Sequence, residues 1–255
     1  MSLHSTQTEF AAHVERREGR SAILLVCEHA SNAFPAPWGT LGLTEGQQSA
    51  HVAWDPGALD LARCLSARLD AALVHAPVSR LIYDLNRGPA RADAMAARSE
   101  VHEIPGNADL TPQDRLQRTE ALYLPFHTAL HAEVARRLAL GQATVLVTIH
   151  SFTPIYHGQK RRVEFGVIHD ADDRMARAIV AEAEAGTDLI CGLNAPYSAA
   201  DGVTHTLRLQ ATPYGLANAM LEIRNDLIAT QAQAEGMADR LAPVLQAALA
   251  RLTED

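Results

Sequence analysis

Runs of apolar residues alternate with amphipathic segments along most of this chain. Three of the runs are short and mainly apolar: Ile23–Cys27, Thr144–Ile149 and Ala219–Ile223. A strand without regular polar positions is buried on both faces, which is typical of parallel sheets covered by helices. We therefore expect these three segments to be central strands of one sheet.

Other segments have apolar residues at helical spacing, or short apolar runs between turn residues. We expect helices at about Asp55–Leu69, Thr111–Leu140, Asp172–Ala185 and Leu227–Leu252. We expect shorter strands at Ala72–His75, Leu81–Tyr83, Glu164–Ile168 and Leu189–Cys191. The segment Asn86–Pro105 contains many Arg, Gly and Pro residues and is predicted to be a long irregular connection, a type of segment that is often functional.

Strands that alternate with helices predict the α/β class, with a mainly parallel or mixed central sheet and helices on both faces. This is a three-layer architecture. The chain shows no internal repeat, no low-complexity tract and no change of composition that would indicate a linker. We therefore expect residues 1–255 to form a single catalytic domain.

The charge and cysteine content exclude several kinds of partner. The net charge of −8 disfavours nucleic acid and anionic membranes. The three cysteines have no paired spacing, so neither a disulfide framework nor a cysteine metal site is predicted. The polar segment Met1–Arg20 lacks the apolar core of a signal peptide, and no apolar run approaches the roughly 20 residues of a membrane span. We expect a cytoplasmic protein; the sequence carries no signal for its oligomeric state.

Polar groups that can bind a metal follow or interrupt the three central strands. His29 comes just after the first strand and His150 just after the second. In open α/β sheets, ligands bind beyond the carboxyl ends of the strands. Each histidine taken alone could equally be a hydrogen-bonded residue at a strand end. Their recurrence in the same position favours a shared site, because two imidazoles and a carboxylate are a common catalytic zinc set.

Asp55 is the candidate for the carboxylate. It precedes Pro56 and Gly57 at the predicted start of a helix, where an aspartate is also a favoured cap. A carboxylate has several acceptor sites, so one residue could both cap the helix and bind a metal. The sequence leaves both roles open.

Glu222 interrupts the third apolar strand, where an isolated charge would be costly to bury. Alternation along the strand places Arg224 on the same face, so the two could form a buried ion pair. Alternatively, Glu222 is the general base of a metal-assisted hydrolysis, with Arg224 binding a substrate carboxylate or a developing oxyanion.

Several other motifs argue against competing chemistries. His127 and His131 have the i, i+4 spacing of a metalloprotease helix, but Thr128 replaces the required glutamate. We therefore expect solvent-facing or cap-type histidines, with an approach to the substrate as the alternative for His127. No glycine-rich phosphate loop follows a strand, and no Gly-x-Ser-x-Gly elbow occurs. Arg161 and Arg162 are interpreted as exposed arginines, with contact to a substrate carboxylate as the alternative.

With these residues identified, most of the sequence resembles the N-formylglutamate amidohydrolase family. The matching blocks lie around the candidate residues described above and in the segments between them. They are Cys27–Asn32, His51–Ala58, Ser79–Arg87, Thr148–Phe152, Pro196–Ser198, Asp201–Thr206 and Leu221–Asp226.

The resemblance implies a phosphorylase/hydrolase-like fold and a zinc-dependent hydrolase of linear amides in amino-acid catabolism. It implies His29, Asp55 and His150 as zinc ligands and Glu222 as the base. Zinc carboxypeptidases place the acidic ligand three residues after the first histidine, where this chain has Asn32. Related cell-wall amidases instead take it from the start of the next helix, as Asp55 would.

The implied substrate is a small N-formyl or N-acyl amino acid such as N-formylglutamate, whose carboxylates need cationic or polar contacts. The substrate contacts inferred from the matching blocks are Asn86, Arg87, Arg224, Ser31, Asn32 and His205. Two alternatives remain: a related zinc amidase with a larger peptide substrate, and a metal-free protein that binds small molecules on the same scaffold.

Overall fold

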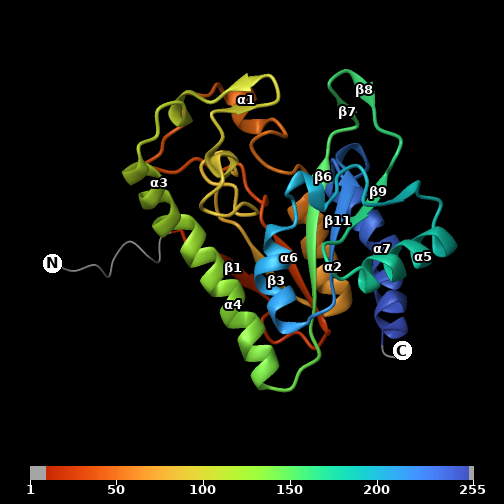
Figure 1. Cartoon of the computed structure of the whole chain (residues 1–255). Coiled ribbons are helices and arrows are strands. Elements are labelled where there is room, and N and C mark those ends of the chain that lie inside the picture. The colour runs from red at the N-terminus through yellow and green to blue at the C-terminus, as the bar shows by residue number, and fades with distance from the viewer. Residues whose placement is uncertain (1–9, 253–255) are drawn as a thin grey trace.

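The computed structural model describes residues 10–252 and is built around a seven-stranded mixed sheet (Figure 1). The strand order is β1-β3-β2-β6-β11-β9-β10. Along the chain these strands are β1 (His13–Glu15), β2 (Ile23–Cys27), β3 (Ala72–His75), β6 (Val145–Phe152), β9 (Phe165–Ile168), β10 (Cys191–Leu193) and β11 (Asn218–Arg224). Two small hairpins are formed by β4 (Arg98–Ser99) with β5 (His102–Glu103), and by β7 (Ile155–Tyr156) with β8 (Gln159–Lys160).

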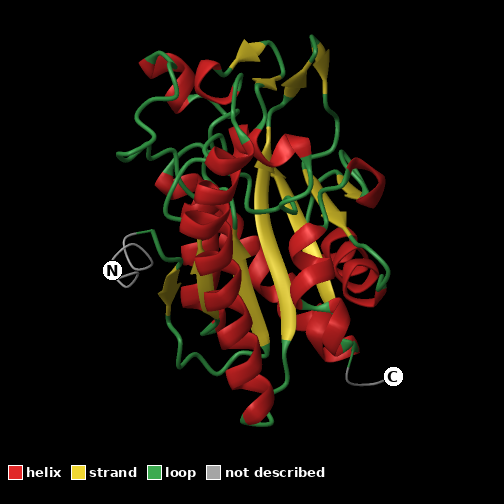
Figure 2. Cartoon of the chain, turned by 60° about the vertical axis from the view of Figure 1, so that its left-hand side comes forward, coloured by secondary structure: helices red, strands yellow, loops and turns green. Residues whose placement is uncertain are grey.

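Helices cover both faces of the sheet, as Figure 2 shows and as the sequence predicted. The α-helices are α1 (Glu45–Ser49), α2 (Ala58–Leu69), α3 (Pro112–Arg118), α4 (Leu124–Ala139), α5 (Arg174–Gly186), α6 (His205–Gln210) and α7 (Gln231–Arg251). A π-helical turn, Thr119–Tyr123, joins α3 to α4. Short 3₁₀ helices lie at Ala92–Met95, Pro105–Asn107, Ala199–Asp201, Thr212–Tyr214 and Asn225–Leu227.

The four middle strands, β3, β2, β6 and β11, run parallel. Strand β1 is antiparallel to β3, and β9 is antiparallel to β11, whereas β10 runs parallel to β9. All residues of β2, β3 and β6 are buried, which explains their nearly continuous apolar sequences. Helices α2, α5 and α7 pack on one another on one side, and α4 contacts α6 on the other. The mixed α/β sheet predicted from the sequence is therefore confirmed.

The strand order reverses at β2, and this reversal creates a place for a site. From β2 the chain passes through α2 to β3 on one side of β2, and then through α4 to β6 on the other side. Connections that leave in opposite directions open a crevice at the carboxyl ends of the two central strands. His29 and His150 lie at these two strand ends.

Some predicted elements differ from the structure. Leu81–Tyr83 is not a strand, because this segment turns back toward the crevice. The predicted helix over Thr111–Leu140 contains the π-helical turn, which precedes Pro125. Proline has no N–H and cannot continue the regular hydrogen-bond ladder, which accounts for the irregular turn.

The expectation of solvent-facing or cap-type histidines on α4 is wrong for His127. This side chain is buried and its Nε2 lies 2.9 Å from the carbonyl oxygen of Leu85. Its i+4 neighbour His131 is exposed and contacts Tyr214. Among residues 10–252, no helix combines the length and apolar character that crossing a bilayer requires.

Gly57 sets the start of α2 and is the position in this region that tolerates no side chain. Its φ angle is 77°, and an added Cβ would lie 2.1 Å from the carbonyl oxygen of Ile228. We predict that Gly57→Ala lowers the free energy of unfolding by about 2–4 kcal/mol, from backbone strain and this clash. Gly236→Ala in α7 has open space, so it should raise that free energy by about 1 kcal/mol. Urea denaturation of both variants tests this; equal effects would contradict it.

Candidate metal centre and active site

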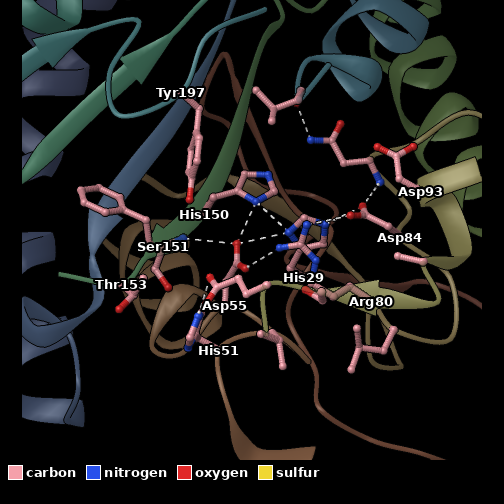
Figure 3. Close-up of a pocket in the computed structure, with 18 of the residues that line it drawn as sticks. His29, His51, Asp55, Arg80, Asp84, Asp93, His150, Ser151, Thr153 and Tyr197 are labelled. Atoms are coloured by element: carbon pink, nitrogen blue, oxygen red, sulfur yellow. Dashed lines mark hydrogen bonds and ion pairs between the residues drawn. The ribbon is translucent and has the colours of Figure 1, made fainter. Parts of the chain in front are cut away.

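A cavity of about 330 Å³ opens at the carboxyl ends of the parallel strands (Figure 3). Its lining comes from distant parts of the sequence, including the two small hairpins and the segments after β2, β3 and β10. The residues used below that line it are His29, Asp55, Arg80, Asp84, Asn86, Arg87, Asp93, His150, Phe152, Thr153, Tyr156, Tyr197 and Glu222.

His29, Asp55 and His150 meet at the base of this cavity, and all three are buried. Nδ1 of His150 lies 3.1 Å from Nδ1 of His29 and 2.9 Å from Oδ2 of Asp55. Nδ1 of His29 lies 3.3 Å from the same carboxylate oxygen. One atom from each residue could therefore contact a common ion, as the sequence predicted for this trio.

The outer nitrogens of both imidazoles face carboxylates. Nε2 of His29 lies 2.7 Å from Oδ1 of Asp84, and Nε2 of His150 lies 3.1 Å from Oε2 of Glu28, close but less well aligned. A carboxylate accepts hydrogen bonds, so these contacts favour the proton on Nε2 and leave the Nδ1 lone pairs facing the centre. Carboxylates hold metal-binding histidines in this way in many proteins.

The charges around the trio fit a cation. Glu28, Asp55 and Asp84 are buried, and Arg80 contacts the two aspartates at 3.2 and 2.7 Å. Burial alone would raise the pKa of Asp55, but the imidazoles and Arg80 lower it far below its ordinary value. Burial opposes a charge on His150, yet Glu28 and Asp55 raise its pKa well above the ordinary value. The trio, with two nitrogens and one oxygen as donors, fits a divalent ion such as zinc.

The helix-cap alternative for Asp55 does not hold. Gly57 is the residue that precedes α2, and no side chain caps that end. The Asp55 carboxylate instead faces the imidazoles and accepts a hydrogen bond from the backbone N–H of Ser151 at 3.3 Å. The position of Asp55 just before α2 directs its side chain into the cavity, and its negative charge faces the imidazoles there.

Glu222 lies opposite His150 in the pairing of β11 with β6 and lines the same cavity. Its side chain is buried, and Oε2 has no hydrogen-bond partner among the described residues. Burial, with a smaller contribution from nearby Asp55, raises the pKa of this carboxyl to about 7. The alternative ion pair is not formed, because Arg224 contacts Glu164 at 3.3 Å and Asp226 at 2.8 Å.

Two of the predicted substrate contacts, Asn86 and Arg87, line the cavity. The Asn86 amide is used within the protein: it donates to the carbonyl of Val203 at 2.5 Å and accepts from the N–H of Thr206 at 3.0 Å. Arg87 donates from Nη1 to the carbonyl of Gly202 and from Nε to Asp93, while its Nη2 has no partner among residues 10–252.

The other four predicted contacts, Ser31, Asn32, His205 and Arg224, are not among the residues that line the cavity. Ser31 accepts a hydrogen bond from a nearby backbone N–H, and Asn32 is exposed. His205 lies behind the cavity wall, with Nε2 2.9 Å from the hydroxyl of Tyr123. These positions give no support to direct substrate contact.

Sequence reasoning gave no role to Asp84, Glu28 or Tyr197. Glu28 immediately precedes His29 in the sequence, but its carboxylate contacts His150 and not His29, which the sequence does not indicate. Asp84 follows a turn that the sequence analysis interpreted as a strand. The available signal was the density of polar residues in Arg80–Arg87, a segment with buried neighbours on both sides.

Comparisons with known proteins identify the family and the fold of this chain. A family model described as N-formylglutamate amidohydrolase matches residues 21–229. A structure of the gene product Atu2144 from Agrobacterium tumefaciens is 50% identical, with a TM-score of 0.93 over 95% of this chain and 96% of that one. An N-formylglutamate amidohydrolase from Ralstonia eutropha JMP134 is 18% identical, with a TM-score of 0.58 over 96% and 97% of the chains, and shows the same fold. No curated protein sequence matches.

The family match covers most of the chain, including the candidate ligands and Glu222. This chain therefore belongs to the N-formylglutamate amidohydrolase family, a family of hydrolases.

Proposed function

We propose that this protein hydrolyses the amide bond of a small N-formyl or N-acyl amino acid of the N-formylglutamate type, with a divalent metal held by His29, Asp55 and His150. The observation that carries the proposal is the convergence of these three buried side chains beside Glu222. The Oε2 atom of Glu222 has no hydrogen-bond partner among the described residues. Family membership supports the reaction type.

The donor set favours zinc, for which two imidazoles, one carboxylate and an open position are a common catalytic arrangement. When bound, the metal would polarise the amide carbonyl and make a water molecule easier to deprotonate. Asp84 and Glu28 would keep the two imidazole rings turned toward the ion through their Nε2 contacts.

Glu222 supplies the proton transfers. Its carboxylate takes a proton from the attacking water and returns one to the departing nitrogen, so that formate, or another carboxylate, and the free amino acid are released. A pKa of about 7 allows the group both to accept and to give up a proton near neutral pH. Burial is the main cause of this raised pKa, and Glu222 is buried because it lies within the central strand β11.

Recognition of a substrate carboxylate is assigned to Arg87, whose side chain is 12% exposed, rather than to Arg98, which also lines the cavity but is 64% exposed and pairs with Glu103. The Nη2 atom of Arg87 has no partner in the described part of the chain, whereas both terminal nitrogens of Arg80 contact aspartates. A guanidinium held by Gly202 and Asp93 is already oriented, so little side-chain freedom is lost on binding.

Turnover and metal content test the role of Glu222. The purified protein should contain about one zinc per chain and hydrolyse N-formylglutamate, and Glu222→Gln should keep the metal while kcat falls by about 10²–10⁴. Glu133→Gln, which changes a buried carboxylate of α4 outside the cavity, is the matched control. Elemental analysis and steady-state kinetics decide. Protein without metal or turnover would favour the metal-free binding alternative, and full activity in Glu222→Gln would remove Glu222 from the mechanism.

Metal affinity tests the role of the two carboxylates that contact the imidazoles. Asp84→Asn and Glu28→Gln should each weaken metal binding by about 10–100-fold, because they loosen the imidazole orientation. Asp93→Asn is the control, since Asp93 lines the same cavity but pairs with Arg87 and Arg91. Competition with a chromophoric chelator measures the affinity. An unchanged affinity in both test variants would show that these carboxylates do not orient the ligands.

The raised pKa of Glu222 should also make the free energy of unfolding of the metal-free protein depend on pH. The pKa of Glu222 rises from 4.5 to about 7 on folding, so the folded state keeps a proton that the unfolded chain has lost. Stability is therefore lost as the pH rises from about 4.5 to 7, by about 3 kcal/mol at about 1.4 kcal/mol per pKa unit. Glu222→Gln should remove this loss, which urea denaturation at pH 5 and pH 8 would measure; equal pH dependence in both proteins would contradict it.

A further inference from the structure

Three aromatic rings surround Arg161, which follows β8 at the edge of the cavity. The Cζ atom of its guanidinium lies 4.3 Å from the ring centre of Tyr156, 4.8 Å from that of Tyr197 and 5.4 Å from that of Phe152. All three rings line the cavity. The expectation that both arginines of this pair are exposed is therefore wrong for Arg161, which is partly buried, although it holds for Arg162.

Arg161 forms no ion pair with an acidic residue among residues 10–252. It is held by the rings and by two hydrogen bonds, from Nη1 to the carbonyl oxygen of Thr153 at 3.4 Å and from Nη2 to the hydroxyl of Tyr197 at 2.9 Å. A cation held on aromatic faces is stabilised by the ring quadrupoles. The charge of this guanidinium is therefore directed at one particular acceptor, the Tyr197 oxygen.

The bond from Arg161 determines what the Tyr197 hydroxyl can do. Its oxygen accepts the Arg161 N–H, so its own hydrogen remains available for another acceptor, and the described residues provide none. A hydrogen bond received from a cation also polarises the hydroxyl and strengthens it as a donor.

The hydroxyl faces the reacting region. Tyr197 lines the cavity together with the ligand trio and Glu222, and Figure 3 shows its ring extending toward His150 and Asp55. Burial, with a contribution from Glu222, raises the pKa of Tyr197 to about 12. The hydroxyl therefore stays protonated at neutral pH.

We propose that Tyr197 donates a hydrogen bond to the substrate's carbonyl oxygen as that oxygen gains negative charge, and that Arg161 is the positioning residue that aims this hydroxyl. This inference rests on the proposed hydrolysis. Donors placed where charge develops lower the barrier more than they strengthen ground-state binding, because the bond strengthens as the reaction proceeds. No proton is transferred from Tyr197; the proton transfers remain with Glu222.

The test is Tyr197→Phe, which removes the hydroxyl and keeps the ring against Arg161. We expect kcat for N-formylglutamate to fall by about 10²-fold, with KM changed less than about threefold and metal content unchanged. A phosphinate analogue with tetrahedral oxygens should lose affinity by a similar factor in calorimetry. Tyr214→Phe, which removes an exposed hydroxyl away from the cavity, is the control. Normal kcat in Tyr197→Phe would overturn the inference.

Substitutions of Arg161 test the positioning role. Arg161→Met should lower kcat nearly as much as Tyr197→Phe, Arg161→Lys should restore part of it, and the double variant should be little worse than either single one. A rise in KM with normal kcat in Arg161→Met would instead show substrate contact and overturn the positioning role. An inactive wild-type protein would refute the proposed function, whereas active wild type with normal Tyr197→Phe would refute this inference alone.

Discussion

The structure depends on a charge balance at the end of its central strands. Three buried carboxylates, Glu28, Asp55 and Asp84, lie around two imidazoles, and Arg80 contacts two of them. Unpaired buried charges would cost several kcal/mol each. A divalent cation at the trio would complete the compensation, so folding and metal binding would be coupled. The same burial that makes the carboxylates costly raises the pKa of Glu222 to about 7.

The sheet brings these groups together without a long preformed motif. His29 and His150 lie at the ends of neighbouring parallel strands, and Glu222 lies opposite His150 on the next strand. The reversal of strand order at β2 keeps the crevice free of helix. Asp55 reaches the crevice from just before α2, where Gly57 and not Asp55 is the N-cap residue. His150 and Glu222 are thus positioned by strands, and His29 and Asp55 by the short segments next to β2 and α2, while the hairpins and longer loops form the walls.

The central strands were predictable from the sequence because their burial produces nearly continuous apolar runs, and the meeting of His29 and His150 followed from the parallel pairing of those strands. Asp55 lies before α2 and not at a strand end, so it was a candidate ligand from its polar surroundings and from the family resemblance. The wall residues were not predictable. Arg224 was expected on the same strand face as Glu222, but it forms ion pairs with Glu164 and Asp226 instead. The alternation of side chains along the strand does not predict either of these pairs. Arg161 looked like a surface charge because the sequence does not show that the β7–β8 hairpin would bring it against Tyr156 and Phe152, or that Tyr197 from a separate segment would join them. Pairings between loops depend on the tertiary fold.

Asn86 joins two walls of the cavity that are more than a hundred residues apart in the chain. Its backbone N–H is bonded to Asp84, which holds His29, and its amide group binds the backbone at Val203 and Thr206. The 202–206 segment is consequently linked through Asn86 to the carboxylate that contacts His29. A change of backbone at residues 203–206 would therefore also alter the support of the His29 imidazole.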